Sequence, residues 1–140
     1  MTKTIDMREM RHLNLFEKIT RIHTRFCFNY NDYIFFCVPH GLISRAVGEN
    51  GKNVRQIHEI LGKRIKIISQ PQGQGISDIQ MFVKQVVSPV TFKDIIVSNN
   101  EIIITAGSQS KAALIGRNKR RLLEMQKIIK DFFGKGLRIV

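Results

Sequence analysis

The residues best suited to bind a ligand lie around Gly48 and Gly51, in the stretch AVGENGKNVR. The residues on both sides favour helix, so the glycines predict a sharp turn between two helices, because glycine accepts positive φ. A helix that starts after Gly51 directs free N–H groups and its positive dipole end toward this turn. Lys52 and Arg55 add full positive charges nearby. The arrangement favours a phosphate over a metal ion or an apolar ligand, and an ordinary corner between two helices is the alternative.

The sequence contains no residue pattern that is typical of an enzyme. Walker and GxSxG motifs are absent, and the 11 acidic residues are too dispersed for a catalytic metal site. The histidines form neither an HExxH motif nor a cluster with cysteine. We therefore predict a protein that is not an enzyme and needs no metal or cofactor. The histidines are His12, His23, His40 and His58.

The two cysteines, Cys27 and Cys37, are too few for a disulfide framework and have no CxxC spacing. Both lie in apolar, strand-like stretches, where a free cysteine packs as a small hydrophobic residue. A cross-strand disulfide between them stays open at this point.

The net charge of +12 is the first indication of a partner. Lys plus Arg number 23 and Asp plus Glu number 11, which favours a polyanion, either nucleic acid or an anionic membrane. No apolar stretch approaches the roughly 20 residues of a membrane span, and the N-terminal residues lack the apolar core of a signal peptide. We therefore predict a cytoplasmic protein without membrane contact; a charge that serves only solubility is the alternative.

The first half has the pattern helix, strand, strand, helix, helix, strand. Apolar residues from Met10 to Ile19 recur every three positions, which is typical of one helix face, and Asp6 with Glu9 suits the first turn of that helix. Glycine or proline follows several of the expected elements. The expected elements are helix 6–22, strands 25–30 and 33–38, helices 40–47 and 52–61, and strand 63–68.

The second half repeats this order. Gly48 corresponds to Gly116 and Asn50 to Asn118, an offset of 68 residues that keeps the apolar positions of the following helix in phase. The repeat predicts an α+β protein with two copies of one domain, each a three-stranded sheet with helices packed on one face. The predicted domains are residues 1–70 and 77–140, with a linker at 71–76.

Two serines are predicted to cap helices of the second half. Ser77 with Gln80 forms a capping-box pattern, and Ser108 precedes a short apolar helix. The expected elements are a helix from 77 that Pro89 ends, strands 90–97 and 101–106, helices 108–115 and 118–133, and strand 137–140.

The loop at Gly48–Gly51 resembles the GxxG loop of a KH domain, and the element order of each half resembles the type II KH arrangement. The resemblance implies that single-stranded RNA or DNA lies beside the loop, with its phosphates facing the loop backbone and Lys52. It also implies an apolar floor for the bases and an edge strand beside them. The expected floor residues are Ile43, Val47 and Val54, and the edge strand carries Arg64 and Lys66.

The second loop reads Gly116-Arg117-Asn118-Lys119, so lysine replaces the closing glycine. A side chain there can hinder a close backbone approach, but the surrounding basic residues concentrate positive charge. We predict that this loop also contacts nucleic acid, and a solvated helix start is the alternative. The predicted RNA-binding residues are Arg45, Gly48, Glu49, Asn50, Gly51, Lys52, Asn53, Arg55, Arg64 and Lys66 in the first half, and Gly116, Arg117, Asn118, Lys119, Arg120 and Arg121 in the second.

Three stretches extend the resemblance to the NusA family, in particular to short archaeal NusA-like proteins with tandem type II KH domains. The resemblance implies single-stranded RNA binding in transcription termination or antitermination, with RNA polymerase as a possible second partner. Bacterial members also carry a polymerase-binding domain and an S1 domain, for which this chain has no room. The three stretches are LFEKIT, AVGENGKNVRQIHEILGKRIKII and KAALIGRNKRRL.

Two other functions stay open from the sequence. One is a different KH factor that binds RNA, such as a ribosome-assembly factor. The other is a protein-docking module on RNA polymerase, which predicts an exposed apolar patch and little salt-sensitive RNA affinity. The sequence does not indicate an oligomeric state.

Overall fold

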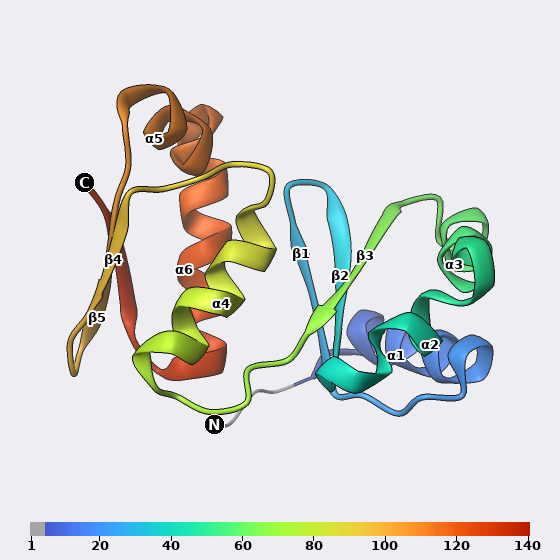
Figure 1. Ribbon diagram of the computed structural model, residues 1–140. Coiled ribbons are helices and arrows are strands. Elements are labelled where there is room, and N and C mark those ends of the chain that lie inside the picture. Colours follow the sequence, from blue (N-terminus) through green and yellow to red (C-terminus); the bar gives the residue numbers. More distant parts are fainter. Residues whose placement is uncertain (1–4) are drawn as a thin grey trace. The chain divides into compact units, whose positions relative to one another are not determined.

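The computed structural model describes residues 5–140, which form two compact units, 5–72 and 73–140 (Figure 1). Each unit has three α-helices and one three-stranded sheet. The predicted α+β fold with two three-stranded sheets is therefore confirmed. No helix within residues 5–140 is both long and apolar enough to cross a membrane.

The first unit follows the predicted order of helix, two strands, two helices and a strand. The central strand, β2, pairs antiparallel with β1 and parallel with β3. Short 3₁₀ turns at His40–Leu42 and Glu49–Gly51 precede α2 and α3. The elements are α1 (Met7–Thr20), β1 (Phe26–Tyr30), β2 (Tyr33–Val38), α2 (Ile43–Val47), α3 (Lys52–Leu61) and β3 (Arg64–Ser69).

Side-chain oxygens set both ends of α1. The Asp6 carboxylate accepts the N–H of Glu9 at 2.8 Å, which confirms the expected first turn. At the other end, the Thr20 hydroxyl donates to the Phe16 carbonyl at 2.7 Å and accepts the N–H of Ile22 at 3.1 Å. The helix therefore ends at Thr20, two residues before the predicted end.

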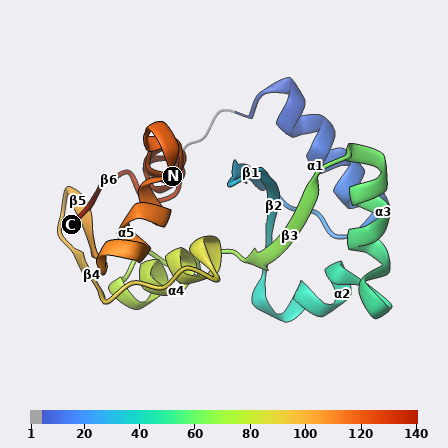
Figure 2. The same cartoon turned by 90° about the horizontal axis from the view of Figure 1, so that it is seen from above.

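The core of the first unit lies between the sheet and its helices, which cover one face (Figure 2). Phe16 of α1 stacks on Phe36 of β2 with ring centroids 4.4 Å apart, and both side chains are fully buried. Ala46 of α2 and Ile57 of α3 belong to the same buried cluster. Because each buried large side chain contributes roughly 1.5–3 kcal/mol, this cluster fixes the two helices that flank the GxxG loop.

The register of β1 and β2 excludes the cross-strand disulfide between Cys27 and Cys37. Cys27 lies opposite Phe36, and Cys37 lies opposite Phe26. Successive residues of a strand point to opposite faces, and Cys27 and Phe36 both face the helices. Cys37 therefore points to the other face, and both cysteines are buried and form no disulfide with each other.

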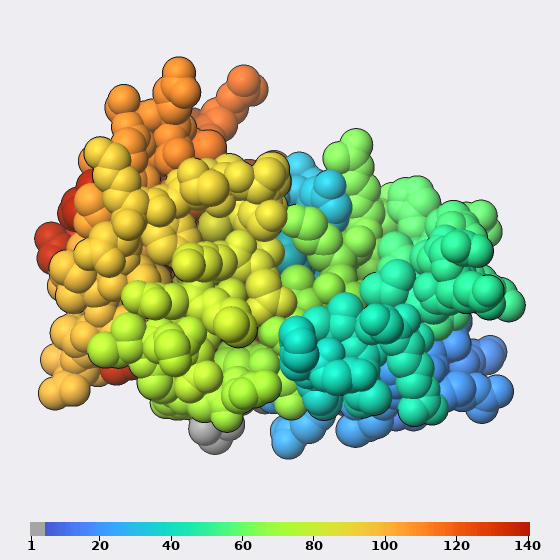
Figure 3. All heavy atoms as spheres, in the orientation of Figure 1, coloured from blue at the N-terminus to red at the C-terminus, as the bar shows by residue number. Residues whose placement is uncertain are grey.

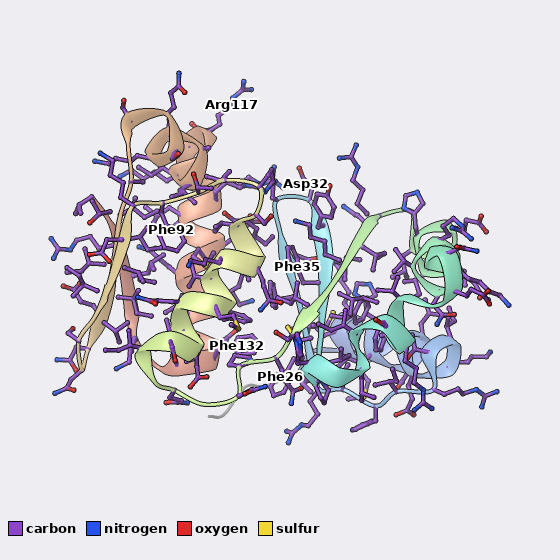
Figure 4. The ribbon with its side chains drawn as sticks, in the orientation of Figure 1. Phe26, Asp32, Phe35, Phe92, Arg117 and Phe132 are labelled. Carbon is purple, nitrogen blue, oxygen red and sulfur yellow. The ribbon has the colours of Figure 1, made fainter. Side chains whose placement is uncertain are left out.

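The second unit repeats the topology, with β5 between an antiparallel β4 and a parallel β6. Its core includes Phe82 and Phe132, whose ring centroids are 4.7 Å apart, and Phe132 is labelled in Figure 4. Met125 and Ile129 of the last helix are buried as well. The elements are α4 (Ile76–Val87), β4 (Asp94–Val97), β5 (Glu101–Thr105), α5 (Ser108–Ile115), α6 (Arg120–Phe133) and β6 (Gly136–Ile139).

Both predicted serine caps are wrong. The N-cap of α4 is Gly75 and that of α5 is Gly107, and neither helix has a side-chain cap. Both glycines have extended backbones, and each serine lies in the first turn of its helix: α4 starts at Ile76, one residue before the expected 77, and α5 starts at Ser108. A glycine at the N-cap replaces serine with little loss of stability.

The first strand of the second unit is shorter than predicted. Val90 donates its N–H to the Val87 carbonyl at 2.9 Å in a turn, and pairing with β5 begins where the Lys93 N–H meets the Thr105 carbonyl at 2.7 Å. The strand therefore starts at Asp94, four residues after the predicted start.

Candidate nucleic-acid interface

The first loop has a backbone that only glycine and asparagine adopt easily. α2 ends at Gly48, whose φ and ψ are 83° and 164°, and Gly51 has 73° and 21°. Between them Asn50 is left-handed, with φ 54° and ψ 29°. The Gly51 N–H donates to the Gly48 carbonyl at 3.0 Å and closes the turn. The predicted need for positive φ at both glycines is confirmed.

The two glycines of this loop have different surroundings. A Cβ atom on Gly48 would lie 2.9 Å from the side chain of Asn53 and 3.0 Å from its backbone nitrogen. A Cβ atom on Gly51 would meet only the Arg55 guanidinium, at 3.5 Å. Gly48 is therefore required by packing inside the loop, whereas a Cβ atom on Gly51 would make only an ordinary van der Waals contact.

Two of the predicted RNA-binding side chains hold the loop in shape. The Asn53 amide donates to the carbonyl oxygens of Ala46, at 3.2 Å, and Arg45, at 3.4 Å, at the end of α2. The Arg55 guanidinium donates to the Asn50 carbonyl, so the cation lies against the loop itself. Asn53 and Arg55 therefore stabilise the turn from within.

The start of α3 leaves donors for a ligand. Gly51 is the N-cap residue and provides no side-chain cap, while the Lys52 N–H bonds to the Glu49 carbonyl. The next N–H groups of the helix lack the usual side-chain partner, and the helix dipole is positive here. Glu49, Asn50 and Lys52 are exposed, and α2 with the turn after it, teal to green, lies at the surface in Figure 3.

The second loop has the same backbone as the first. Gly116 has φ and ψ of 74° and 172°, Asn118 has 55° and 30°, and Lys119 has 60° and 22°. The φ and ψ angles of Asn118 are within 15° of those of Asn50, and the angles of Lys119 are within 15° of those of Gly51. Lys119 thus adopts a left-handed conformation that costs a residue with a Cβ about 1–2 kcal/mol.

Four basic residues of the second loop divide into two groups. Arg117, Lys119 and Arg120 are exposed, and the Arg117 side chain extends away from the ribbon in Figure 4. Arg121 instead lies beneath Gly116, where a Cβ atom would be 2.6 Å from the Arg121 Cγ. Its guanidinium pairs with Glu124 at 3.2 Å, and its side chain is only 11% exposed. Arg121 therefore supports this loop as Asn53 supports the first.

Arg64 and Lys66 lie apart from the loop on the other face of the sheet. They pair in register with Tyr33 and Phe35, whereas the neighbouring Ile65 faces the helices. Their cationic groups lie 5.7 Å and 5.3 Å from the centre of the Tyr33 ring. The structure does not bring these two predicted site residues to the face that carries α2 and α3. The apolar residues expected to form the floor, Ile43, Val47 and Val54, are half-buried on that helical face.

A groove that the sequence analysis missed lies between α6 and β6. It has a volume of about 670 Å³ and begins at Leu122, three residues after Lys119. The sequence shows Lys127 and Lys130 three positions apart on a helix longer than its counterpart, but this spacing does not predict a groove. The groove is lined by Glu101, Leu122, Gln126, Lys127, Lys130, Lys135, Gly136, Leu137, Arg138 and Ile139.

No group of three or more His, Cys, Asp or Glu side chains within residues 5–140 is placed to hold a metal ion. Each unit has one glycine-led loop, one helix start without a side-chain cap and basic side chains around it.

These features define an α+β protein whose two units are consistent with tandem KH-like domains. The fold is similar to that in the crystal structure of APE1850, with a TM-score of 0.69 and 23% identity over 96% of this chain and 99% of that one. No protein-family model matches the sequence.

Several archaeal proteins with the name "Probable transcription termination protein NusA" are similar in sequence. The protein from Halococcus morrhuae is 28% identical over 94% of this chain and 97% of its own length. The protein from Methanocaldococcus jannaschii is 25% identical over 87% of this chain and 66% of its own length. The protein from Methanococcus vannielii is 26% identical over 71% of this chain and 56% of its own length. The resemblance to archaeal NusA-like proteins is therefore confirmed.

Proposed function

We propose that this chain binds single-stranded RNA and acts in transcription termination or antitermination. Residues 1–70 and 77–140 would be two type II KH domains joined by the linker 71–76. The archaeal relatives support this process, because they bear the name of a probable transcription termination protein. Direct contact with RNA polymerase stays a prediction.

One observation carries the RNA-binding proposal. A left-handed Gly51, whose Cβ position has no close contact except the Arg55 guanidinium at 3.5 Å, is followed directly by an α-helix without a side-chain cap. A phosphate can approach the backbone there and accept hydrogen bonds from helix N–H groups, and Lys52 supplies a full charge. The carboxylate of Glu49 is exposed, so it can stay in solvent while the loop backbone meets the phosphate.

The two loops would bind phosphate in different ways. The first would act through its backbone, with Asn53 and Arg55 in supporting roles. The second has Lys119 where the first has Gly51, so phosphates would meet the exposed cations of Arg117, Lys119 and Arg120. Arg64 and Lys66 are not required for either contact, because they lie on the opposite sheet face.

Fluorescence anisotropy with a labelled single-stranded RNA tests the proposal. The logarithm of the association constant should fall with the logarithm of salt concentration by about 0.7 for each phosphate contacted. Duplex RNA of the same length should bind more weakly, since the loop clamps an unpaired backbone. Absence of RNA binding at low salt, or a preference for duplex, would contradict the proposal and leave a protein-docking role.

A further inference from the structure

The first loop contains the only Asn-Gly pair of the sequence, Asn50-Gly51. An asparagine before glycine is chemically labile in water, because the backbone nitrogen of the glycine can attack the carbonyl carbon of the asparagine side chain. Glycine permits this attack best, since it has no Cβ atom to crowd the ring that forms. Asn50 is exposed, so water reaches its side chain. The residue types of this loop therefore favour a covalent change at Asn50.

The second loop provides an internal comparison with the same backbone. Asn118 has φ 55° and ψ 30°, against 54° and 29° for Asn50, and it is also exposed. The backbone nitrogens that follow the two asparagines close their turns in the same way, by hydrogen bonds of 3.0 Å and 3.2 Å. The residue after Asn118 is Lys119, whose side chain hinders attack by its own nitrogen. The two asparagines therefore differ in their neighbours and not in their conformation.

Arg55 adds a second difference between the loops. Its guanidinium donates to the Asn50 carbonyl, which belongs to the same peptide group as the Gly51 nitrogen. When that nitrogen loses its proton, the negative charge is shared with the carbonyl oxygen, so the cation stabilises the reactive form. The positive end of α3 acts in the same direction. At the position equivalent to Arg55, the second unit has the uncharged Leu123.

We propose that Asn50 is a site of spontaneous deamidation. The deprotonated Gly51 nitrogen attacks Cγ of Asn50 and forms a new C–N bond, and the side-chain nitrogen leaves as ammonia. Water then opens the resulting succinimide ring at either carbonyl carbon. The products are aspartate and isoaspartate, in which the main chain runs through Cβ. The net reaction consumes water and releases ammonia, so it needs no other reactant.

The closed loop restrains this reaction. At a ψ of 29° the Gly51 nitrogen lies across the Cα–C bond from the Asn50 Cβ, so ring closure needs rotation about that bond. The hydrogen bond from the Gly51 N–H to the Gly48 carbonyl must therefore open first. Deamidation thus takes place in protein whose first loop is transiently open.

The product changes the charge of the first loop, and its effect on binding rests on the proposed function. A carboxylate at position 50 lies beside the start of α3 and Lys52, where it attracts the same positive groups as a phosphate and repels that phosphate. Isoaspartate also lengthens the backbone within the turn. The second loop keeps Asn118, so deamidation removes one of the two proposed phosphate sites.

Peptide mass spectrometry of the folded protein, aged at mildly alkaline pH, measures both asparagines in one sample. Asn50 should convert at least several-fold faster than Asn118, and isoaspartyl methyltransferase should label the peptide that contains Asn50. Lys119→Gly should accelerate the reaction of Asn118 several-fold, and Leu123→Arg added to it should accelerate the reaction further. Equal wild-type rates, or no acceleration in Lys119→Gly, would overturn the site. No further gain from Leu123→Arg would overturn the role of the guanidinium.

Fluorescence anisotropy before and after ageing tests the effect on RNA binding. The affinity of the wild type should fall in step with the conversion of Asn50, and Asn50→Asp should show a several-fold loss from the start. Asn50→Gln is the ageing control, because its longer amide must close a larger ring and reacts much more slowly. An equal loss on ageing in Asn50→Gln, or full affinity in Asn50→Asp, would overturn the effect on binding. A wild-type chain that binds no RNA before ageing would overturn the proposed function and leave the modification site standing.

Discussion

The two loops combine one backbone conformation with two different sets of side chains. Gly48–Gly51 and Gly116–Lys119 share their dihedral angles, yet the first closes with glycine and the second with lysine. The closing glycine is therefore not required for the turn. The first glycine of each loop is required, because Asn53 at Gly48 and Arg121 at Gly116 fill the space where a Cβ atom would lie.

The difference also shows where strain is stored. Lys119 keeps a left-handed backbone that glycine would adopt without cost, and residues with such strain cluster at functional sites. The first loop leaves the backbone open, and the second places a cation at the same point. Under the proposed function, the first unit would recognise phosphate through its backbone and the second through a side chain.

The largest expected effect concerns the first glycine. Gly48→Ala adds a clash with Asn53 in a region of φ and ψ that is nearly restricted to glycine, so the free energy of unfolding should fall by about 3 kcal/mol. Gly51→Ala should lower it by only about 1 kcal/mol, since the added Cβ atom would make only an ordinary contact with the Arg55 guanidinium. Urea unfolding measures both. Equal losses for the two variants would contradict the different roles of the glycines.

Lys119→Gly separates stability from binding. Relief of the left-handed strain should raise the free energy of unfolding by about 1 kcal/mol, and loss of the cation should weaken RNA binding a few-fold. Lys119→Asn should bind RNA with the same affinity as Lys119→Gly, because asparagine also tolerates positive φ and carries no charge. Tighter RNA binding by Lys119→Gly would mean that the lysine obstructs the loop.

The smallest effect concerns pH and the histidines, all of which lie in the first unit. Burial lowers the pKa of His12 from its ordinary value of 6.5, and repulsion from Arg8 lowers it further, while Asp6 and Glu9 oppose the shift. The folded state favours neutral His12, so its contribution to stability is present above pH 6.5 and declines as the pH falls below that value. Hydrogen exchange should show this decline in the first unit of the wild type and less of it in His12→Gln. An equal decline in the variant would exclude His12 as the cause.

Much of the fold was predictable because glycine and apolar spacing report local structure directly. The repeat at 68 residues, the element order and the positive φ at Gly48 and Gly51 all follow from residue type. The caps at Ser77 and Ser108 were wrong because a neighbouring glycine can start a helix in place of serine.

The rest depends on tertiary packing. Neither the packing of Arg121 beneath Gly116 nor the groove beside α6 can be read from local pattern, since each joins residues from different elements. Strand alternation could have placed Arg64 and Lys66 on the face away from Ile65, where the structure has them.

The central claim, that RNA phosphate meets the backbone at Gly51, is tested most directly by the RNA affinity of Gly51→Asp. Gly62 is a matched control, because it is also left-handed, with φ 67°, and has open space around it at the other end of α3. Gly51→Asp should weaken binding of single-stranded RNA several-fold or more, because it puts a negative charge at the phosphate position. Gly51→Asn should weaken binding less, and Gly62→Asp should hardly change it, since neither puts a negative charge at that position. Unchanged affinity in Gly51→Asp, or an equal loss in Gly62→Asp, would contradict the account.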